Sequence, residues 1–402
     1  MTGLLEHAPA PPDQRIKRRI AEAIERHRTE LLELSHRIHA NPEPAFEERQ
    51  AATWVADALR RGGFDVEHPT GSLETAVRAR MTGGRGRDGP RIAILAEYDA
   101  LPGLGHGCGH NTMAASGVGA ALGLAAVADE LAGEIVVLGT PAEERGSGKQ
   151  VMIDEGLFDG IDAALLVHPW DRTVVETTLM ACEDIDVVFT GLEAHAAAEP
   201  WKGRNALDAM VMLLNGIALW RQQLTPDARV HGIVLEGGTA ANIIPARAVG
   251  RFMVRNTVEA DFLAMEERFG ELVGAAADAA RCTGEVVYSG RSSSMRHNRV
   301  LGARFAANLT AYGMEVGSAA DMLGSSDFGN VSQLLPTIQP AIAICERGVP
   351  NHSLEFRAAA VTPRADEIVL LSATVVAQTA YELFADPAIV GAAWAEFRAT
   401  RR

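Results

Sequence analysis

The chain has 402 residues, of which 47% are hydrophobic and 22% are charged, and its formal net charge is -15. This composition is ordinary for a globular protein, and the length allows two domains with a sizeable buried core. The acidic balance argues against nucleic acid or an anionic membrane surface as a partner, because both bind basic patches.

Targeting signals and cysteine usage indicate the cellular compartment in which we expect the protein. No apolar run of about 18 residues occurs, so we expect no membrane-spanning segment. The N-terminal "MTGLLEHAPAPPDQR" has neither the basic start nor the long apolar stretch of a secretory signal. The cysteines are far apart in a long chain, so we expect free thiols in a reducing compartment and a cytoplasmic protein. The four are Cys108, Cys182, Cys282 and Cys345.

The first part of the chain has the pattern of an α/β domain. Apolar residues at helical spacing predict a helix over 14–39, and a second helix over 48–61 ends at two glycines. Buried-strand runs then alternate with helices, which is typical of a mostly parallel sheet. The predicted strands are 91–97, 134–140 and 161–168, and the predicted helices between them are 112–131 and 148–156.

The pattern changes after about residue 176. Strand-like and helical stretches follow one another in the order β-α-β-β-α-β, which is that of a ferredoxin-like unit. The stretches are 182–191, 204–222, 229–238, 247–256, 258–281 and 284–290. The α/β pattern resumes at about 298. We therefore predict a discontinuous α/β catalytic domain over 1–176 and 293–402, with an inserted α+β domain over 177–292.

The glycine-rich segment "EYDALPGLGHGCGHN" (97–111) follows a predicted strand and opens a helix, so phosphate binding has to be considered first. Its glycines do not complete a G-x-G-x-x-G fingerprint. The segment "RGSGKQ" (145–150) looks like a P-loop but has Glu143 where the first glycine belongs and lacks Ser or Thr after Lys149. Neither segment fits a phosphate site.

A metal explains the residue types better. Cys108 and His110 lie two apart at a strand–helix turn, where a helix N-terminus and a metal both favour the thiolate. Zinc-like metals bind thiolate, imidazole and carboxylate together. Further candidates lie at other strand ends or in loops, and sites in open α/β sheets assemble at the carboxyl ends of strands. They are Glu143, Glu144, His168 and His352. Each alone has an ordinary structural explanation, but the combination favours a metal site.

Several motifs resemble the aminoacylase/carboxypeptidase family of di-metal peptidases. They are the segment 97–111, "GTPAEE", "LVHP", "GLEAHAAAEPWKGRNALDA", "GGTAANIIPARA" and "HS" at 352–353. The likeness is closest to its amidohydrolase branch, which contains aminobenzoyl-glutamate hydrolases and hydrolases of N-acyl amino acids and dipeptides. It extends from about residue 35 to about 380. It implies a zinc-peptidase-like α/β catalytic domain and an inserted ferredoxin-like lid or dimerisation domain.

The resemblance also implies roles for individual residues. Two divalent ions, with Mn and Zn favoured over Co, would be bridged by Cys108 and bound by His110, Glu144, His168 and His352. Glu143 matches the general base, and Asp99 matches the aspartate that orients a ligand. His195 resembles a histidine that reaches the partner subunit's site in a homodimer and stabilises the oxyanion. Asn242 and Arg255 resemble substrate-binding positions, and Arg suits a carboxylate.

The chain departs from the family pattern at two positions. Glu97 replaces a histidine ligand of the wider family, and Asn111 replaces a common aspartate. Asn111 shifts the likeness toward the aminobenzoyl-glutamate and dipeptide hydrolases, and we expect it to be a helix N-cap. His106 is expected to be structural. For Asp327 two roles are equal alternatives: a cap of the helix that follows it, or a residue of the functional site.

The implied function is metal-dependent hydrolysis of the amide bond of N-acyl amino acids or small dipeptides. Two alternatives remain. The chain could be a catalytically silent binding or regulatory member of the same fold, although the expected ligands and base are all present. Alternatively, Cys108 could be a covalent thiol nucleophile paired with His110 or His106, which would leave the glutamates without a role.

Overall fold

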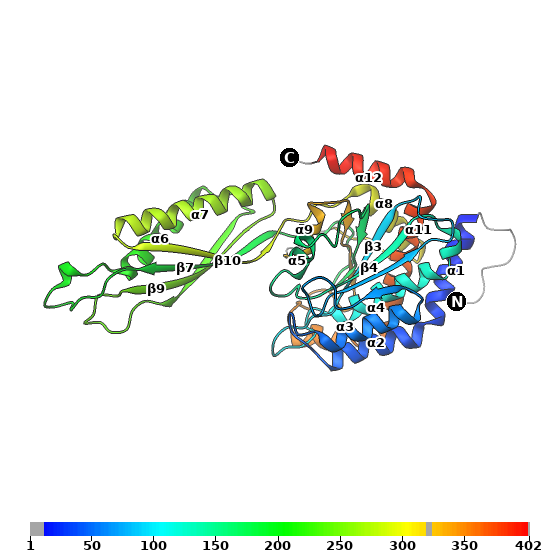
Figure 1. Cartoon of the computed structure of the whole chain (residues 1–402), viewed down its shortest axis with the longest axis horizontal. Helices are drawn as coiled ribbons and strands as arrows, with labels where there is room; N and C mark the ends of the chain where they lie inside the picture. The colour runs from blue at the N-terminus through cyan, green and yellow to red at the C-terminus, as the bar shows by residue number, and fades with distance from the viewer. Residues whose placement is uncertain (1–11, 319–323, 401–402) are drawn as a thin grey trace. The chain divides into compact units, whose positions relative to one another are not determined.

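The computed structural model describes residues 12–318 and 324–400. These residues form two compact units, each with its own hydrophobic core. Unit 1 comprises 12–177, 296–318 and 331–400, and unit 2 comprises 178–295 and 324–330 (Figure 1). The lid and dimerisation roles expected for the inserted segment remain predictions.

Unit 1 is built on a six-stranded sheet with the order β1-β2-β4-β3-β5-β11. Strand β3 pairs in parallel with β4 and β5, and β5 pairs in parallel with β11, whereas β1 and β2 are antiparallel. A separate parallel pair joins β6 and β12. The strands are β1 (Asp65–Glu67), β2 (Val77–Thr82), β3 (Arg91–Glu97), β4 (Glu134–Thr140), β5 (Ala163–Leu165), β6 (His168–Trp170), β11 (Thr337–Ile338) and β12 (Ala341–Ala343).

Helix α4 (His110–Ala125) is the central helix of unit 1 and packs against β3, α2 and α11 (Figure 1). A Cβ atom at Gly117 would lie 2.7 Å from the carbonyl oxygen of Leu95, so only glycine lets α4 approach β3 this closely. The first residue of α4, His110, thereby lies at the carboxyl end of β3. The other helices outside 178–295 are α1 (Pro12–Arg26), α2 (Arg28–Ala40), α3 (Arg49–Arg61), α5 (Gly148–Asp154), α8 (Arg299–Ala311), α9 (Phe328–Ser332), α10 (Leu354–Ala359), α11 (Pro363–Ala385) and α12 (Pro387–Ala399).

Helix α11 is long and apolar enough to cross a membrane by length and composition alone. However, 89% of its most apolar window is buried inside the structure. Core helices of globular proteins pass the same test because they too are apolar on all sides. The absence of a membrane-spanning segment stays a prediction.

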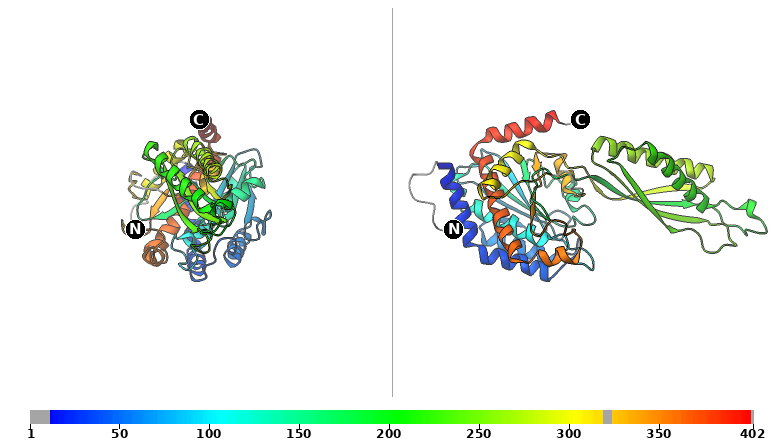
Figure 2. Two further views of the ribbon diagram at one scale, coloured as in Figure 1. Left: turned by 90° about the vertical axis from the view of Figure 1, so that its left-hand side faces the viewer. Right: turned by 180° about the vertical axis from the view of Figure 1, so that it is seen from behind.

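Unit 2 has the predicted order β7-α6-β8-β9-α7-β10, and all its strand pairs are antiparallel. The sheet order is β10-β7-β9-β8, which is the ferredoxin-like arrangement. Helices α6 and α7 lie together on one face of this sheet (Figures 1 and 2). The elements are β7 (Ala181–Thr190), α6 (Ala206–Trp220), β8 (Arg229–Glu236), β9 (Arg247–Asn256), α7 (Glu259–Ala279) and β10 (Thr283–Ser292).

Two predicted elements of unit 1 are divided in the structure. The helix expected over 14–39 is two helices, α1 and α2, separated at His27. The strand expected over 161–168 is divided into β5 and β6, which belong to different sheets. The partner segment is interrupted at the same place, because Pro340 lies between β11 and β12 and has no N–H to donate.

Candidate metal centre

The candidate ligands meet at the carboxyl ends of β3 and β4. Glu97 is the last residue of β3, Cys108 follows in the loop that leads into α4, and His110 is the first residue of α4. Glu143 and Glu144 follow β4 by three and four residues. Parallel neighbours end at the same edge of a sheet, so these segments converge there.

Three groups of potential ligand atoms form in the described part of the chain, and within each group all atoms lie within 4.8 Å of one another. Cys108 belongs to two groups, and His110 also belongs to two. A shared thiol is what a ligand that bridges two ions requires. The groups, which we call the Cys108 cluster, are Cys108, His110 and His168; Cys108, Glu144 and His352; and Glu97, His110 and Glu143.

Two close contacts define the cluster's geometry. The Sγ atom of Cys108 lies 3.5 Å from Nε2 of His168. Nε2 of His352 lies 3.3 Å from a carboxylate oxygen of Glu144. The backbone of His352 has a positive φ of 61°, and its N–H donates to the carbonyl of Gly107 at 2.9 Å, which fixes the 352 loop beside the cysteine loop.

Hydrogen bonds orient the two buried histidines. Nδ1 of His110 lies 2.9 Å from Oδ1 of Asp99, and Nδ1 of His168 lies 2.6 Å from the carbonyl oxygen of Pro169. Each Nδ1 donates to its oxygen, so each ring turns its Nε2 toward the cluster. The second oxygen of Asp99 accepts the N–H of Glu144 at 2.9 Å, so one aspartate positions two candidate ligands.

The donor atoms fit a divalent metal. His110 Nε2, Glu144 Oε1 and Glu97 Oε2 are buried and have no hydrogen-bond partner. Buried polar atoms are normally satisfied, and cations bound among the groups of the Cys108 cluster would satisfy them. Sulfur, imidazole nitrogen and carboxylate oxygen together are the donors that zinc and related metals prefer.

Burial sets the protonation of the cluster. Burial, reinforced by the charge of Glu144, raises the pKa of the Cys108 thiol well above its usual value. A bound metal would instead favour the thiolate. Burial also lowers the pKa of His168 to about 4, which keeps its imidazole neutral. Burial alone would raise the pKa of Asp99, but the neighbouring His110 holds it below its usual value.

Glu97 and Lys149 are the residues that sequence reasoning missed. Glu97 stands where the wider family has a histidine ligand, yet its Oε2 lies 3.6 Å from His110 Nε2. Lys149 belongs to the rejected P-loop-like segment, yet its Nζ lies 2.7 Å from Oε1 of Glu97, and both side chains are fully buried. The available signal was a lone lysine in a glycine-rich loop that follows a buried strand.

The three remaining predicted site residues lie in unit 2. Nδ1 of His195 accepts the N–H groups of Ala197 and Ala198, each at 3.2 Å, so the ring proton is on Nε2. Asn242 is close by, since its carbonyl accepts the N–H of Ala196 at 3.0 Å.

Arg255 is held elsewhere in unit 2. It lies on β9, and its Nε donates to the Cys182 sulfur at 3.3 Å. The predicted site residues are thus divided between the units. Those of unit 1 lie together in one cluster, whereas His195 and Asn242 lie close to each other in unit 2.

The prediction that Asn111 is the N-cap of helix α4 is wrong. Helix α4 starts at His110 with Gly109 as N-cap, so Asn111 is not the cap. Its side-chain amide is buried and donates to Ser35 Oγ at 2.9 Å and to the Ala360 carbonyl at 3.0 Å. Gly109 takes the cap position because the backbone there has a φ of 79°, which suits glycine.

The other two residues left open by the sequence lie outside the Cys108 cluster. His106 is buried, its Nε2 lies 3.1 Å from the Ile38 carbonyl, and burial lowers its pKa to about 3. This matches a structural role. Asp327 is fully buried in unit 2, directly before α9.

Comparisons with known proteins identify the family of the chain. Residues 93–381 match the model of peptidase family M20/M25/M40. The chain is similar to Xaa-Arg dipeptidase of Mus musculus, with 36% identity over 95% of this chain and 92% of the relative. It is also similar to the B subunit of p-aminobenzoyl-glutamate hydrolase from Escherichia coli (strain K12), with 30% identity over 94% of each chain.

Solved structures share the fold. A putative aminohydrolase from methicillin-resistant Staphylococcus aureus has a TM-score of 0.78 at 20% identity. The match covers 92% of this chain and 100% of that structure. The YXEP protein of Bacillus subtilis, described as a dinuclear metal-binding peptidase, has a TM-score of 0.67 at 20% identity over 88% of this chain and 99% of its own. Given the family match over most of its length, the chain belongs to peptidase family M20/M25/M40.

Proposed function

We propose that this protein is a metal-dependent hydrolase that cleaves the amide C–N bond of dipeptides or N-acyl amino acids. The observation that supports this most directly is the sharing of Cys108 by two ligand groups, which suits two adjacent ions. The proposed ligands are Cys108, His110, Glu144, His168 and His352. Mn and Zn are the proposed ions, and Co suits the same donors.

The chain's own residues would handle the proton. When bound, two divalent ions would lower the pKa of water and polarise the scissile carbonyl. Glu143 Oε2 lies 3.8 Å from His110 Nε2, and its side chain is 8% exposed, so it borders the ligands. Glu143 would accept a proton from the attacking water and return it to the leaving amine, a contribution of about 10²–10⁴-fold.

The relatives suggest the substrate class. One is named for Xaa-Arg dipeptides and another for p-aminobenzoyl-glutamate, and both span nearly the whole chain. Both substrate types have an amide bond with an amino acid on the amine side. We therefore propose a substrate whose leaving amine is an amino acid, with Arg255 and Asn242 as binding residues for its polar groups.

We further propose that the protein is a homodimer through unit 2. Strand β8 is an edge strand, and its apolar side chains Ile233, Val234 and Leu235 are 60%, 43% and 50% exposed. An exposed apolar edge strand favours pairing with another strand. In such a dimer His195, with its proton on Nε2, would donate to the oxyanion of the partner subunit's site, which is worth about 3–4 kcal/mol.

The test is amine release from Xaa-Arg dipeptides, β-alanyl dipeptides, p-aminobenzoyl-glutamate and N-acyl amino acids. Protein reconstituted with Mn or Zn is compared with Glu143→Gln, and bound metal is measured by mass spectrometry. We expect the wild type to hydrolyse a member of the panel and the variant to bind about two ions yet lose at least 10²-fold in rate.

Two results would contradict the proposal. Activity that survives removal of metal by a chelator would instead support Cys108 as a thiol nucleophile. Absence of both bound metal and hydrolysis would support a silent binding protein of the same fold.

A further inference from the structure

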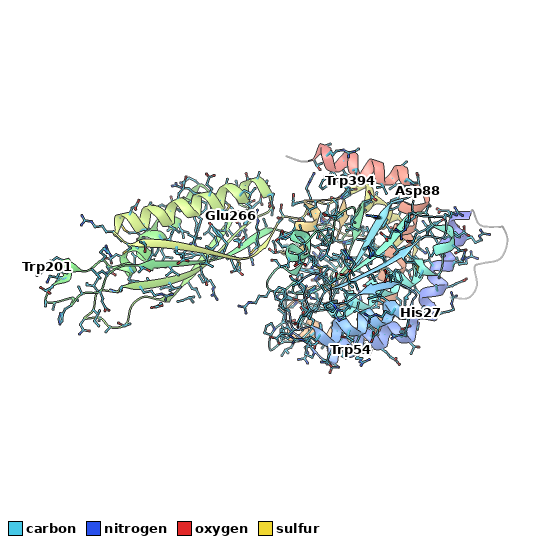
Figure 3. The ribbon with its side chains drawn as sticks, viewed as in Figure 1. His27, Trp54, Asp88, Trp201, Glu266 and Trp394 are labelled. Carbon is cyan, nitrogen blue, oxygen red and sulfur yellow. The ribbon has the colours of Figure 1, made fainter. Side chains whose placement is uncertain are left out.

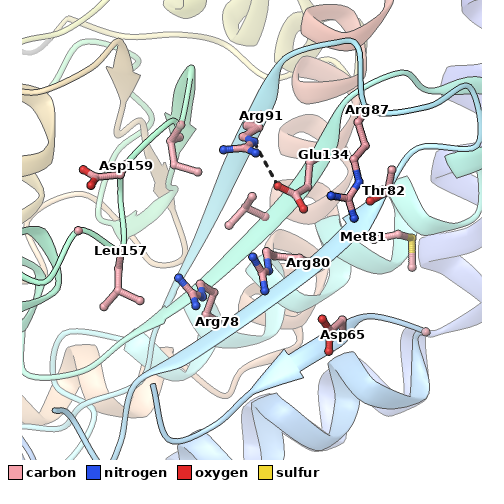
Figure 4. A pocket seen from close by; sticks show the side chains of 14 residues that line it. Asp65, Arg78, Arg80, Met81, Thr82, Arg87, Arg91, Glu134, Leu157 and Asp159 are labelled. Carbon is pink, nitrogen blue, oxygen red and sulfur yellow. Dashed lines mark ion pairs between the residues drawn. The ribbon is translucent and has the colours of Figure 1, made fainter. Parts of the chain in front are cut away.

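Unit 1 has a second polar hollow at the opposite end of its sheet from the Cys108 cluster. It has a volume of about 540 Å³ and lies over the outer face of β2, β4 and β3, near the amino ends of β3 and β4 (Figure 4). Such a volume is within the range of small-molecule sites, about 300–1,000 Å³. Since β3 and β4 each span seven residues, the two sites are separated by about 20 Å.

Four arginines line this hollow: Arg78, Arg80, Arg87 and Arg91. Strand register explains how three of them share one face, because Arg80 pairs with Val136 and Arg91 pairs with Glu134 across neighbouring strands. The fourth, Arg87, comes from the loop between β2 and β3. Figure 4 shows the four guanidinium groups around the carboxylate of Glu134.

Internal carboxylates satisfy two of these arginines. Arg91 lies 3.3 Å from Glu134, and Arg78 donates to Glu67 at 3.1 Å. Among the described residues, the guanidinium groups of Arg80 and Arg87 make no hydrogen bond or ion pair, although Arg80 is the register partner of Asp65 and, with Arg78, lowers the pKa of Glu67. Each has five N–H donors in a planar fork that matches carboxylate and phosphate oxygens.

We propose that this hollow, with Arg80 and Arg87 as its anchors, binds a small molecule that carries two carboxylate or phosphate groups. The occupant is a small molecule because the chain's net charge of -15 repels long polyanions, whereas a compact anion responds to the local guanidinium groups. Val136 supplies an apolar floor between the arginines for the carbon frame of such a ligand. The site is separate from the proposed amide hydrolysis and does not depend on it.

The experiment titrates metal-loaded protein with ethane-1,2-disulfonate, a dianion that does not chelate the metals, at constant ionic strength. Binding is measured by calorimetry for the wild type, for Arg80→Gln/Arg87→Gln, and for the control Arg15→Gln/Arg18→Gln. The control removes two exposed arginines of α1 and changes the net charge equally. Circular dichroism and metal content check that all three proteins are folded.

We expect the dianion to bind the wild type and the control equally and to bind Arg80→Gln/Arg87→Gln about tenfold more weakly or worse. Succinate and inorganic phosphate are titrated separately. The one that binds more tightly shows whether the site prefers carboxylate or phosphate groups. Equal affinity in all three proteins, or no binding to the wild type in the millimolar range, would overturn the proposal.

Discussion

Lys149 and Glu97 form a fully buried ion pair, with 2.7 Å between Nζ and Oε1. A lysine is almost never fully buried unless it is paired. Its partner belongs to the Cys108 cluster, and Asp99, Glu143 and Glu144 are further carboxylates near His110 of that cluster. Lys149 also contributes, after His110, to the lowered pKa of Asp99. Its positive charge therefore opposes the repulsion between Glu97 and Asp99.

Replacement of Lys149 by Met should therefore destabilise unit 1 by about 3–5 kcal/mol, because Glu97 would be a buried, unpaired charge. The double variant Glu97→Gln/Lys149→Met should lose less than the sum of the single variants. Urea unfolding followed by fluorescence measures this. As control, Lys202→Met removes an exposed lysine that pairs with Glu199 and should cost less than about 1 kcal/mol. A loss no larger than the control's would show that the pair does not stabilise the fold.

Asp99→Asn should weaken metal binding by about 10–100-fold, because Asp99 fixes the His110 tautomer and positions the Glu144 backbone. Competition with a chromophoric chelator measures the affinity. Asp57→Asn, an exposed change on α3, is the matched control and should leave the affinity unchanged. Identical affinities for the two variants would exclude an orienting role for Asp99.

The proposed dimer can be tested at strand β8. Ile233→Lys/Leu235→Lys places two charges on the exposed edge strand and should convert dimers into monomers in sedimentation experiments. Leu354→Lys changes a residue of unit 1 that is 65% exposed and should have no such effect.

Mixed dimers test donation between subunits. His195→Ala and Glu143→Ala protein, each inactive alone, should regain activity when mixed, because one site in the hybrid keeps both groups. Failure to regain activity in verified hybrids would count against donation in trans.

Glu183 makes the stability of unit 2 depend on pH. Burial, with the neighbouring Glu266 on α7 (Figure 3), raises the pKa of Glu183 from 4.5 to about 7. The folded state then holds a proton that the unfolded state releases, so the contribution of Glu183 to stability is full below pH 4.5 and is lost as the pH rises toward about 7.

The variant Glu183→Gln should remove this loss, so its thermal midpoint should decline less than that of the wild type between pH 5 and pH 8, roughly the window set by the two pKa values. Glu285→Gln, an exposed change on β10, should decline as the wild type does. Parallel curves for all three proteins would show that Glu183 is ionised normally in the folded protein.

The sequence by itself determined the succession of elements and most of the cluster. Continuous apolar runs identified β3 and β4, which are buried on both faces. Period-two and period-3.6 patterns identified the six elements of unit 2, because burial of one face imposes those periods. A metal site was already indicated by two pairs of sequence neighbours. They are Cys108 and His110 in a glycine-rich turn, and Glu143 and Glu144 after a strand, and few other kinds of site need those residue types together.

Only the tertiary structure decided which distant groups meet. The separation of β5 from β6 depends on Pro340 in a partner segment, and the burial of Lys149 depends on Glu97 at the end of another strand. Arginines from β2, β3 and their connecting loop likewise gather only after β2 and β3 pair with β4. A local sequence pattern reports the face that a residue presents, whereas the charge opposite that face is set by strand order and register.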